Sequence, residues 1–323
     1  MSRKPKVLLT EPVFREVHEL LEKYFELHVG KRGQFNHANT LRDAISRYDG
    51  LLCMLSNPVN STVLSNASIL KVVANYAVGY NNIDLAACRS HNIRVANTPD
   101  VLTETTADGT VALLLSTVKR ITESERFLRE GCFDGWSPTA FLGLELNGAT
   151  AGIIGMGRIG QAVAKRLRAF GMKIIYSNPN RLPESVENEL QARWFEDPIQ
   201  LASRADVISL HCPLNTRTHH LVDSDFLDAM QPGAYLINAS RGPVVDELAL
   251  AKALHEKRIA GAGIDVYEFE PEVNELLLTA PNAVLIPHIT SATKPTRLKM
   301  GMLAAGAIAK TLCGADYPCN FIA

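Results

Sequence analysis

The stretch from residue 149 to residue 170 constrains the fold more than any other part of this sequence. An apolar run, residues 149–154, leads into a glycine-rich turn, Gly-Met-Gly-Arg-Ile-Gly, at residues 155–160. The run is too short to cross a membrane and ends at glycines, so it predicts a buried strand. Residues 161–170 carry apolar side chains at helical spacing, and a second strand is expected at residues 173–176. The stretch therefore predicts a strand–turn–helix–strand unit.

Each glycine of this turn has its own role in such a unit. Gly155 permits the tight turn, Gly157 lets the backbone approach a pyrophosphate, and Gly160 lets the helix pack closely on the strand. Free N–H groups and the dipole at the helix start, at Arg158 and Ile159, favour the negative charge of the pyrophosphate. Because the strands and the helix flank the turn in the required order, we predict a dinucleotide site. A merely structural turn is the alternative.

Composition and charge exclude several classes of protein. At 323 residues, with 46% apolar and 21% charged residues, the chain is expected to form two globular domains. The net charge of −1 provides no basic field that would attract nucleic acid or an anionic membrane, so we expect neither as a partner. No segment has the length and apolarity of a membrane span or a secretory signal. The six cysteines lack paired spacing, which favours reduced thiols in a cytoplasmic protein.

The first hundred residues alternate between strands and helices but contain no glycine fingerprint. This half is therefore expected to form a parallel sheet that is not the nucleotide module. Strands are expected at residues 6–10, 49–54, 70–74 and 92–96, and helices at 14–25 and from 61.

The alternation resumes after the glycine turn and predicts a doubly wound sheet of about six strands. Before the turn, residues 102–122 predict one long helix, which we interpret as a buried connector between domains. A helix is also expected at 297–311, and it should return to the first domain, which lacks a closing helix. The remaining expected strands are 207–211, 234–238, 261–266 and 284–286, and the remaining expected helices are 198–203, 224–230 and 247–256.

These patterns predict an α/β protein with two doubly wound parallel-sheet domains. Residues 103–289 are expected to form a Rossmann dinucleotide-binding domain. Residues 1–102 and 290–323 are expected to form a discontinuous, flavodoxin-like substrate domain. The chain would then cross between the domains twice.

Ligands of doubly wound sheets lie beyond the carboxyl ends of the strands, and polar side chains follow three expected strands there. Arg241 follows the strand that ends at Asn238, Asp265 ends the next strand, and His288 follows the last one. Glu270 lies shortly beyond Asp265. Taken singly, each has an ordinary explanation as a surface arginine, a solvated carboxylate or a strand-end histidine.

Several motifs in this order resemble the D-isomer-specific 2-hydroxyacid dehydrogenase family. The resemblance covers essentially the whole chain and is strongest toward glyoxylate/hydroxypyruvate reductases and 2-ketogluconate reductases. It implies NADP- or NAD-dependent reduction of a small 2-keto acid to the D-2-hydroxy acid. Besides the glycine turn, the motifs are Val78-Gly79-Tyr-Asn-Asn-Ile-Asp84, Val101-Leu-Thr-Glu-Thr-Thr-Ala107, Arg241-Gly-Pro-Val-Val-Asp-Glu247, Gly263-Ile-Asp265-Val-Tyr-Glu-Phe-Glu270-Pro271 and Pro287-His288-Ile-Thr-Ser-Ala-Thr293.

The resemblance assigns the family's catalytic arginine, glutamate and histidine to Arg241, Glu270 and His288. A guanidinium can hold the substrate carboxylate with two parallel hydrogen bonds and reach the adjacent carbonyl oxygen. A protonated His288 can give its proton to that oxygen while hydride arrives from the nicotinamide. Glu270 would accept a hydrogen bond from the other ring nitrogen and favour the imidazolium.

The same resemblance implies further contacts. The backbone N–H groups of Val78 and Gly79 resemble a second carboxylate clamp, with a plain turn as the alternative. Asp265 resembles the residue that steadies the nicotinamide end, with a turn cap as the alternative. The other implied cofactor contacts are Thr106, His211, Pro213 and Thr218.

The segment after the second strand of the glycine unit indicates which dinucleotide is preferred. NAD enzymes normally carry an acidic residue about 20 positions past the glycines, on the ribose 2′-hydroxyl. Residues 176–181 contain no carboxylate. Ser177 and Asn178 can donate hydrogen bonds, and Arg181 can pair with a 2′-phosphate. We predict NADP as the preferred cofactor; the alternative is a solvated Arg181 and an enzyme that also uses NAD.

Three histidines, His211, His219 and His220, raise the question of a metal site. No acidic or cysteine partner accompanies them at a suitable spacing in the sequence. We therefore expect no metal.

The substrate must carry a carboxylate beside a carbonyl, and glyoxylate, hydroxypyruvate and 2-ketogluconate all qualify. A cleft that closes and expels water suits such an anion, and Leu55, Ser56 and Trp136 are expected to border it. Two alternatives remain: a phosphite dehydrogenase-like enzyme, and a cofactor-sensing binding protein similar to transcriptional co-repressors of this family. The resemblance also implies a homodimer built on the nucleotide domain, with the 102–122 helix and the Trp136 loop at the interface.

Overall fold

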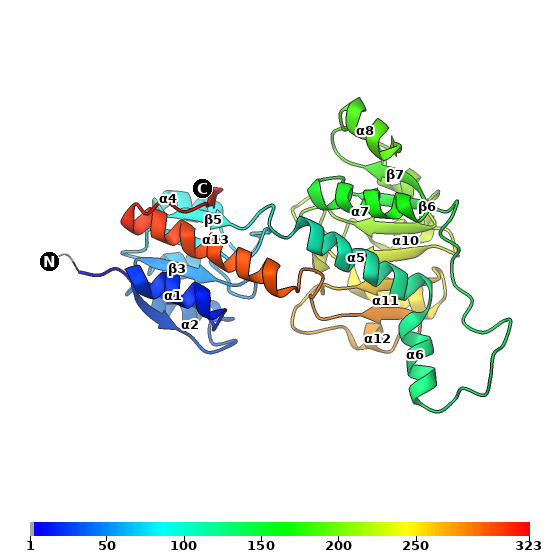
Figure 1. The fold of residues 1–323 in the computed structure, drawn as a ribbon, viewed down its shortest axis with the longest axis horizontal. Helices are drawn as coiled ribbons and strands as arrows, with labels where there is room; N and C mark the ends of the chain where they lie inside the picture. The colour runs from blue at the N-terminus through cyan, green and yellow to red at the C-terminus, as the bar shows by residue number, and fades with distance from the viewer. Residues whose placement is uncertain (1–2) are drawn as a thin grey trace. The chain divides into compact units, whose positions relative to one another are not determined.

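The computed structural model describes residues 3–323, and the chain divides into two compact units. Unit 1 comprises the chain up to Leu102 together with Thr293–Ala323, and unit 2 is Thr103–Ala292. Each unit is a sheet of mainly or entirely parallel strands with helices on both faces, which confirms the predicted fold class (Figure 1). None of the helices within residues 3–323 combines the length and apolar character that a bilayer-spanning segment requires.

The sheet of unit 1 has the strand order β13-β5-β4-β3-β1-β2, and all neighbours are parallel except the terminal pair β13–β5. The central strands β3 and β4 are buried along their whole length, as expected for parallel strands covered on both faces. The strands are β1 (Lys6–Leu9), β2 (Glu26–Val29), β3 (Gly50–Cys53), β4 (Val72–Asn75), β5 (Arg94–Asn97) and β13 (Asn320–Phe321).

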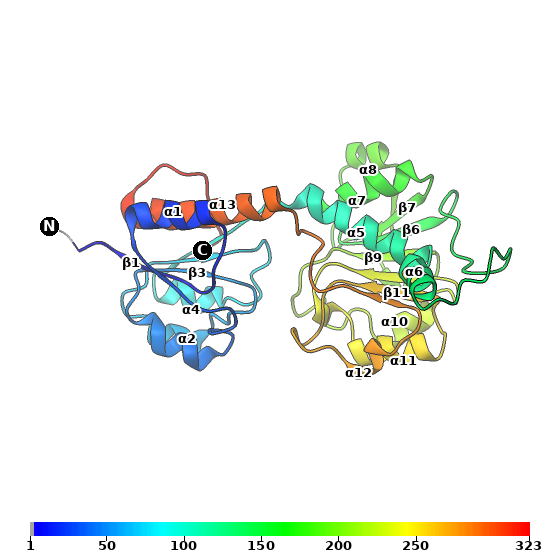
Figure 2. The ribbon, with the colours of Figure 1, turned by 60° about the horizontal axis from the view of Figure 1, so that its bottom comes forward.

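Two helices, α1 (Arg15–Tyr24) and α13 (Lys294–Cys313), lie side by side on one face of this sheet, and α2 and α4 lie on the other (Figure 2). The expected helix at 297–311 is α13, which packs on β3 and β4. The second face is closed by apolar side chains of α2 (Ala38–Ile45), α3 (Ser61–Leu64) and α4 (Leu85–Ser90), such as Leu41, Val63 and Cys88.

The sheet of unit 2 is entirely parallel and has the order β12-β11-β10-β9-β6-β7-β8. The glycine turn follows β6, whose neighbours β7 and β9 continue the chain in opposite directions along the sheet, so this is the point where the strand order reverses. The sheet has seven strands, whereas about six were predicted. They are β6 (Thr150–Ile154), β7 (Lys173–Ser177), β8 (Ala192–Trp194), β9 (Val207–Leu210), β10 (Tyr235–Asn238), β11 (Gly261–Ile264) and β12 (Ala283–Leu285).

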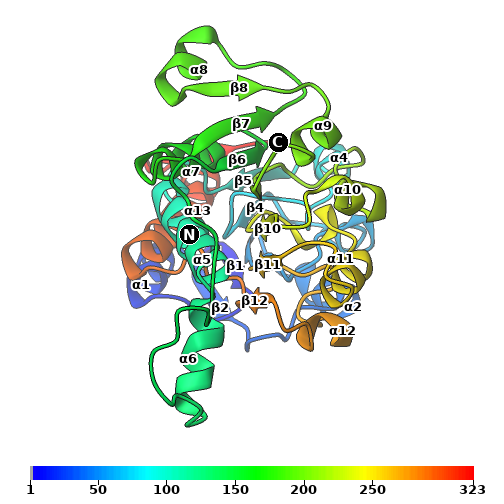
Figure 3. The same ribbon diagram turned by 90° about the vertical axis from the view of Figure 1, so that its right-hand side faces the viewer.

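Helices cover both faces of this sheet (Figure 3). On one face, α5 (Thr103–Val118) and α7 (Arg158–Ala169) pack on each other and close a core around Ile153 and Tyr176. The other face is closed by a second core that includes Leu201, Phe226 and Leu250. Its helices are α9 (Pro198–Ala202), α10 (Ser224–Ala229), α11 (Glu247–His255) and α12 (Glu275–Leu278); α8 (Glu184–Leu190) joins β7 to β8.

The prediction of one long helix over residues 102–122 is wrong. The helix α5 ends at Val118, and a separate helix, α6 (Ile121–Arg129), begins after Arg120, whose φ of +54° is left-handed. Neither glycine nor proline marks this break, so the sequence pattern gave no signal for it. The Arg120 guanidinium pairs with Glu123 in the first turn of α6 at 2.6 Å, which holds the bend.

Candidate active site

Three of the predicted side chains follow neighbouring strands at the carboxyl edge of the unit 2 sheet. Arg241 lies three residues after β10, Asp265 directly after β11, and His288 three residues after β12. Since these strands are adjacent and parallel, the sheet itself brings the three segments together.

The His288 imidazole contacts the Glu270 carboxylate: Nδ1 lies 3.1 Å from Oε2. The other oxygen, Oε1, accepts a hydrogen bond from the Tyr267 backbone N–H at 3.1 Å. Burial raises the pKa of Glu270, but the hydrogen bond and charge of His288, the Tyr267 N–H and the charge of Arg241 lower it, and the net pKa lies below its usual value. Glu270 is therefore a carboxylate at neutral pH, placed to stabilise a protonated His288.

Arg241 joins the same cluster through Glu270. Burial lowers the pKa of the Arg241 guanidinium, and the negative charge of Glu270 opposes that effect. The backbone at Arg241 is fixed, because its carbonyl accepts a hydrogen bond from Asn238 Nδ2 at 3.0 Å. The next residue, Gly242, packs so closely that a Cβ there would lie 1.8 Å from the Tyr267 carbonyl oxygen. The segments that carry the arginine and the glutamate are thus in direct contact.

Asp265 is fully buried and holds the turn that carries His288. Its Oδ1 accepts a hydrogen bond from the Ile289 N–H at 2.6 Å, and its Oδ2 accepts two from Thr290, from N–H at 3.1 Å and from Oγ1 at 2.7 Å. His288 N–H in turn donates to the Asp265 carbonyl. Burial raises the pKa of Asp265, while these hydrogen bonds act in the opposite direction. These contacts are those of the turn cap that was the alternative interpretation.

A second buried carboxylate, Glu247, holds the segment that carries Glu270. Its Oε2 accepts a hydrogen bond from the Glu268 N–H at 2.8 Å, and its Oε1 accepts one from the Asn274 N–H at 2.6 Å. A second hydrogen bond joins the same two residues, since Glu268 Oε2 accepts from the Glu247 N–H at 3.3 Å. Sequence reasoning missed this role of Glu247, since its partners are backbone N–H groups of a distant loop.

The glycine turn is tightly packed at two of its glycines and open at the third. Gly155 has a φ of +94°, and a Cβ there would lie 2.4 Å from Cys212 N; a Cβ on Gly160 would lie 2.4 Å from the Gly155 carbonyl oxygen. The fold itself therefore requires these two glycines. A Cβ on Gly157 would instead meet open space, and Gly157 is itself the N-cap residue of α7, which starts at Arg158 and Ile159. This open space beside a helix N-terminus fits an anionic group.

The residues predicted to bind a 2′-phosphate lie at the end of β7. Ser177 is the last residue of the strand, and Asn178 Oδ1 accepts a hydrogen bond from the Met156 N–H of the glycine turn at 2.7 Å. Arg181 is partly exposed and pairs with Glu187, with Nη2 2.7 Å from Oε2. This pairing carboxylate on α8 was not predicted, because it lies outside residues 176–181.

The loop after β9 contains three of the implied cofactor contacts. Burial lowers the pKa of His211 to about 4, so its imidazole is neutral, and Nε2 lies 2.8 Å from Ser209 Oγ. Thr218 Oγ1 donates to the Pro213 carbonyl at 2.6 Å and closes the turn. The fourth contact, Thr106, lies on α5, and its buried hydroxyl has no hydrogen-bond partner within the described part of the chain.

Four of the implied substrate contacts belong to unit 1. Leu55 and Ser56 follow β3, and Val78 and Gly79 follow β4. The carbonyl oxygens of Val78 and Gly79 each accept a hydrogen bond of 2.7 Å, from the side-chain amides of Asn97 and Asn75 respectively. These bonds fix the orientation of the two peptide units. In unit 2, the Trp136 side chain is 85% exposed, on the loop after α6.

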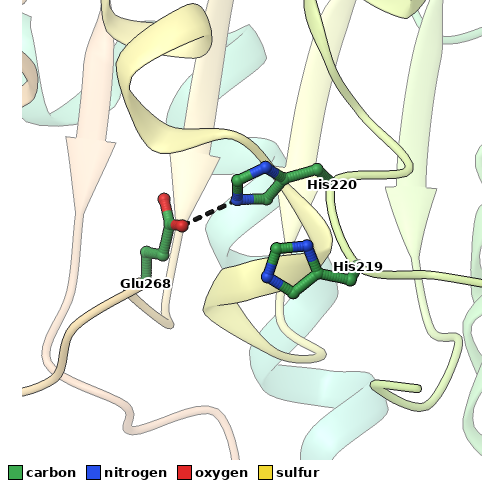
Figure 4. Close-up of side chains that lie close together, drawn as sticks. All are labelled: His219, His220 and Glu268. Carbon is green, nitrogen blue, oxygen red and sulfur yellow. Dashed lines mark hydrogen bonds and ion pairs between the residues drawn. The ribbon is translucent and has the colours of Figure 1, made fainter. Parts of the chain in front are cut away.

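The fold gives His220 an acidic partner that lies far from it in the sequence. His220 Nε2 lies 2.7 Å from Oε1 of Glu268, which is 48 residues further along the chain (Figure 4). Spacing in the sequence does not reveal this pair, because the loop after β9 and the segment after β11 meet only in the folded sheet.

A cavity of about 760 Å³ in unit 2 lies away from Arg241, Glu270 and His288. Its lining includes Tyr235, Ala260 and Asn282, at the amino ends of β10, β11 and β12. Ligands of such sheets lie at the carboxyl edge, so this cavity is at the edge opposite to the one where Arg241, Asp265 and His288 follow their strands.

Comparisons with known proteins agree with this geometry. Residues 111–290 match the model of the D-isomer specific 2-hydroxyacid dehydrogenase NAD-binding domain. A glyoxylate reductase of Thermococcus litoralis is 45% identical over 306 residues, which cover 94% of this chain and 92% of that protein.

Solved structures extend the likeness to the whole fold. The TT0316 protein of Thermus thermophilus is 39% identical with a TM-score of 0.88, and the match covers 98% of this chain and all of that one. An NADPH-dependent glyoxylate/hydroxypyruvate reductase of Sinorhizobium meliloti, solved with NADP and malonate, is 34% identical with a TM-score of 0.86, covering 98% and 97% of the two chains. This chain therefore belongs to the family of D-isomer specific 2-hydroxyacid dehydrogenases.

Proposed function

We propose that this dehydrogenase uses NADPH to reduce glyoxylate, hydroxypyruvate or 2-ketogluconate to the corresponding D-2-hydroxy acid. The observation that carries the proposal is the cluster of Arg241, Glu270 and His288 at the carboxyl edge of the unit 2 sheet. The identity to the Thermococcus glyoxylate reductase favours glyoxylate among the three.

The glycine turn and the start of α7 would hold the pyrophosphate of a dinucleotide, and the bound dihydronicotinamide supplies the hydride. The chain's own groups do the rest. Arg241 binds the substrate carboxylate and polarises the adjacent carbonyl, since a guanidinium offers several N–H donors in one plane. Glu270 engages His288 Nδ1, which leaves Nε2 for the substrate. His288 then delivers its proton to the carbonyl oxygen as the carbonyl carbon accepts the hydride.

The preference for NADPH rests on the end of β7. Residues 176–181 provide no carboxylate that would repel a 2′-phosphate, and Ser177, Asn178 and Arg181 offer donors. The Arg181 side chain is 62% exposed while it pairs with Glu187. The relative solved with NADP supports the same preference.

A homodimer and a cytoplasmic location complete the proposal. The loop after α6 carries exposed apolar side chains, Phe133, Trp136 and Leu142, which a second copy of the chain would cover. The cytoplasmic location rests on the cysteine pattern of the sequence and stays a prediction.

The decisive experiment is a substrate panel assayed with both cofactors. We expect oxidation of NADPH with glyoxylate, hydroxypyruvate or 2-ketogluconate, D-configured product where the product is chiral, and a higher kcat/KM with NADPH than with NADH. Reduction of the cofactor by phosphite would indicate the phosphite dehydrogenase alternative. Cofactor binding without turnover on any 2-keto acid would indicate the sensing protein. Either result would overturn the proposal.

A further inference from the structure

Two histidines and a glutamate outside the catalytic cluster gather on the loops that follow β9 and β11. One ligand atom of each of His219, His220 and Glu268 lies within 4.8 Å of the other two. Figure 4 shows the two imidazole rings one above the other, each with a ring nitrogen on the side where the Glu268 carboxylate lies. Their ring centroids are 4.1 Å apart. Three metal-ligating groups from two distant segments thus point at one location.

We propose that His219, His220 and Glu268 bind a divalent transition-metal ion such as Zn²⁺, Co²⁺ or Ni²⁺. Two imidazoles and one carboxylate are ligands that these ions accept, with the remaining positions open to water. Bonds of about 2 Å to a Zn²⁺ ion place its ligand atoms roughly 3 Å apart. The His220–Glu268 contact of 2.7 Å needs only to open slightly. The His219 ligand atom, which lies within 4.8 Å of the other two, needs only to approach them by a side-chain adjustment.

The backbone around the three ligands is already held in place. His219 N–H donates to the Asn215 carbonyl at 2.9 Å, and His220 N–H donates to the Pro243 carbonyl at 2.8 Å. Two hydrogen bonds to Glu247 fix Glu268. The Glu268 N–H donates to the Glu247 carboxylate, and the Glu268 carboxylate accepts from the Glu247 N–H. Contacts of this kind orient ligands before the metal arrives and strengthen its binding.

The competing interpretation is a plain hydrogen bond between His220 and Glu268 beside a solvated His219. His219 distinguishes the two, because it takes no part in that bond yet is required as the third ligand. Removing its imidazole therefore leaves the His220–Glu268 contact intact and affects only a metal site. His219 also lies outside the catalytic cluster and the proposed cofactor contacts, so the His219→Ala variant should keep its basal activity.

The experiment uses the untagged full-length chain near pH 7.5, where imidazoles are mostly neutral. Zn²⁺ is titrated calorimetrically, and Co²⁺ is titrated by its visible absorption. The wild type, His219→Ala, Glu268→Gln and a control, His37→Ala, are compared; His37 is an exposed histidine of unit 1. We expect one ion per chain in the wild type and the control, and a dissociation constant raised roughly tenfold or more in the other two variants. Zn²⁺ should also raise the Tm of the wild type but not that of His219→Ala.

Two results would overturn the proposal. One is the absence of stoichiometric binding by the wild type. The other is equal affinity in His219→Ala and His37→Ala, which would indicate non-specific binding; a thiolate-to-cobalt absorption band would then point to exposed cysteines such as Cys132 or Cys313. The Tm of each metal-free variant shows whether that variant is folded. If His219→Ala does not fold, Glu268→Gln provides an independent test of the metal site.

Discussion

His288 Nδ1 lies 3.1 Å from Glu270 Oε2, and this contact joins segments that follow two different strands of the unit 2 sheet. The pKa of Glu270 lies below its usual value, so its carboxylate is charged throughout the neutral range. The pair therefore links the protonation of the imidazole to a fixed negative charge, and the proposed reaction consumes that imidazole proton.

Replacing Glu270 by Gln should change the pH dependence of keto-acid reduction. An amide stabilises the imidazolium less than a carboxylate does, so the alkaline limb of the kcat profile should move to lower pH. Steady-state rates of NADPH oxidation over a pH series measure this shift. An unchanged alkaline limb would contradict the role assigned to the carboxylate.

The same substitution should change the acid stability of the protein. A carboxyl group whose pKa is lowered by folding contributes stability that is fully present above its unfolded pKa of about 4.3 and is lost as pH falls through the folded value. The wild type should therefore be more stable than Glu270→Gln at pH 6, and the difference should shrink as pH falls below about 4. Urea unfolding at several pH values measures the difference in the free energy of unfolding between the two proteins. A difference that grows in acid would contradict the expected direction of the effect.

Replacing Glu247 by Gln should lower kcat more than it changes substrate or cofactor binding. One amide oxygen cannot replace both acceptor oxygens that hold the Glu268 and Asn274 N–H groups, so the segment that carries Glu270 should lose its fixed position. Misplacement of a catalytic group by about an ångström can cost on the order of a hundredfold in rate. The control is Glu275→Gln, an exposed residue at the start of α12.

We therefore expect kcat to fall by roughly tenfold to a hundredfold in Glu247→Gln, with little change in the Kd for NADPH. Wild-type kcat in that variant, or an equal loss in the control, would show that Glu247 does not position the catalytic segment. Assays well below the Tm of the variant separate this effect from a loss of folded protein.

Two glycines of the turn, Gly155 and Gly157, should differ sharply when each is replaced by Ala. Gly157→Ala should leave the Tm nearly unchanged and raise the Kd for NADPH by roughly tenfold or more, because its Cβ meets open space that the pyrophosphate would need. Gly155→Ala should lower the Tm, because φ is +94° and the Cβ would clash with Cys212 N. Thermal unfolding and fluorescence titration with NADPH measure both effects. Unimpaired NADPH binding by Gly157→Ala would remove the glycine turn from the cofactor site.

Cofactor preference should depend on Arg181. Arg181→Ala should raise the KM for NADPH by roughly tenfold or more while leaving the KM for NADH within about twofold, because only NADPH carries the 2′-phosphate. Lys165→Ala, on the exposed side of α7, is the control for a general loss of positive charge. Equal effects on both cofactors would show that Arg181 does not recognise the phosphate.

Much of the fold could be predicted from the sequence, because buried parallel strands are short apolar runs bounded by turn residues. The strands β3, β4, β6 and β9 all lie within the ranges expected for them or within one residue. Edge strands lack this signal: β2 (Glu26–Val29) is mostly exposed, and β8 (Ala192–Trp194) is only three residues long with an exposed Arg193. Neither was predicted.

The contacts that hold the site together were harder to predict than its members. The sequence motifs that contain Arg241, Glu270 and His288 can be recognised from a single sequence. The Glu247 carboxylate binds N–H groups 21 and 27 residues away, and His220 meets Glu268 across 48 residues. Which of these distant residues meet depends on which strands are neighbours in the sheet. The spacing of residues along the sequence does not indicate the strand order.

The central claim, reduction of a 2-keto acid with proton transfer from His288, is tested most directly by one comparison. Purified wild type and His288→Ala are mixed with NADPH and glyoxylate, and the rate of NADPH oxidation is measured together with the Kd for NADPH. We predict turnover by the wild type, a kcat lower by roughly two to four orders of magnitude in the variant, and equal NADPH binding by both. Wild-type turnover in His288→Ala would contradict the account.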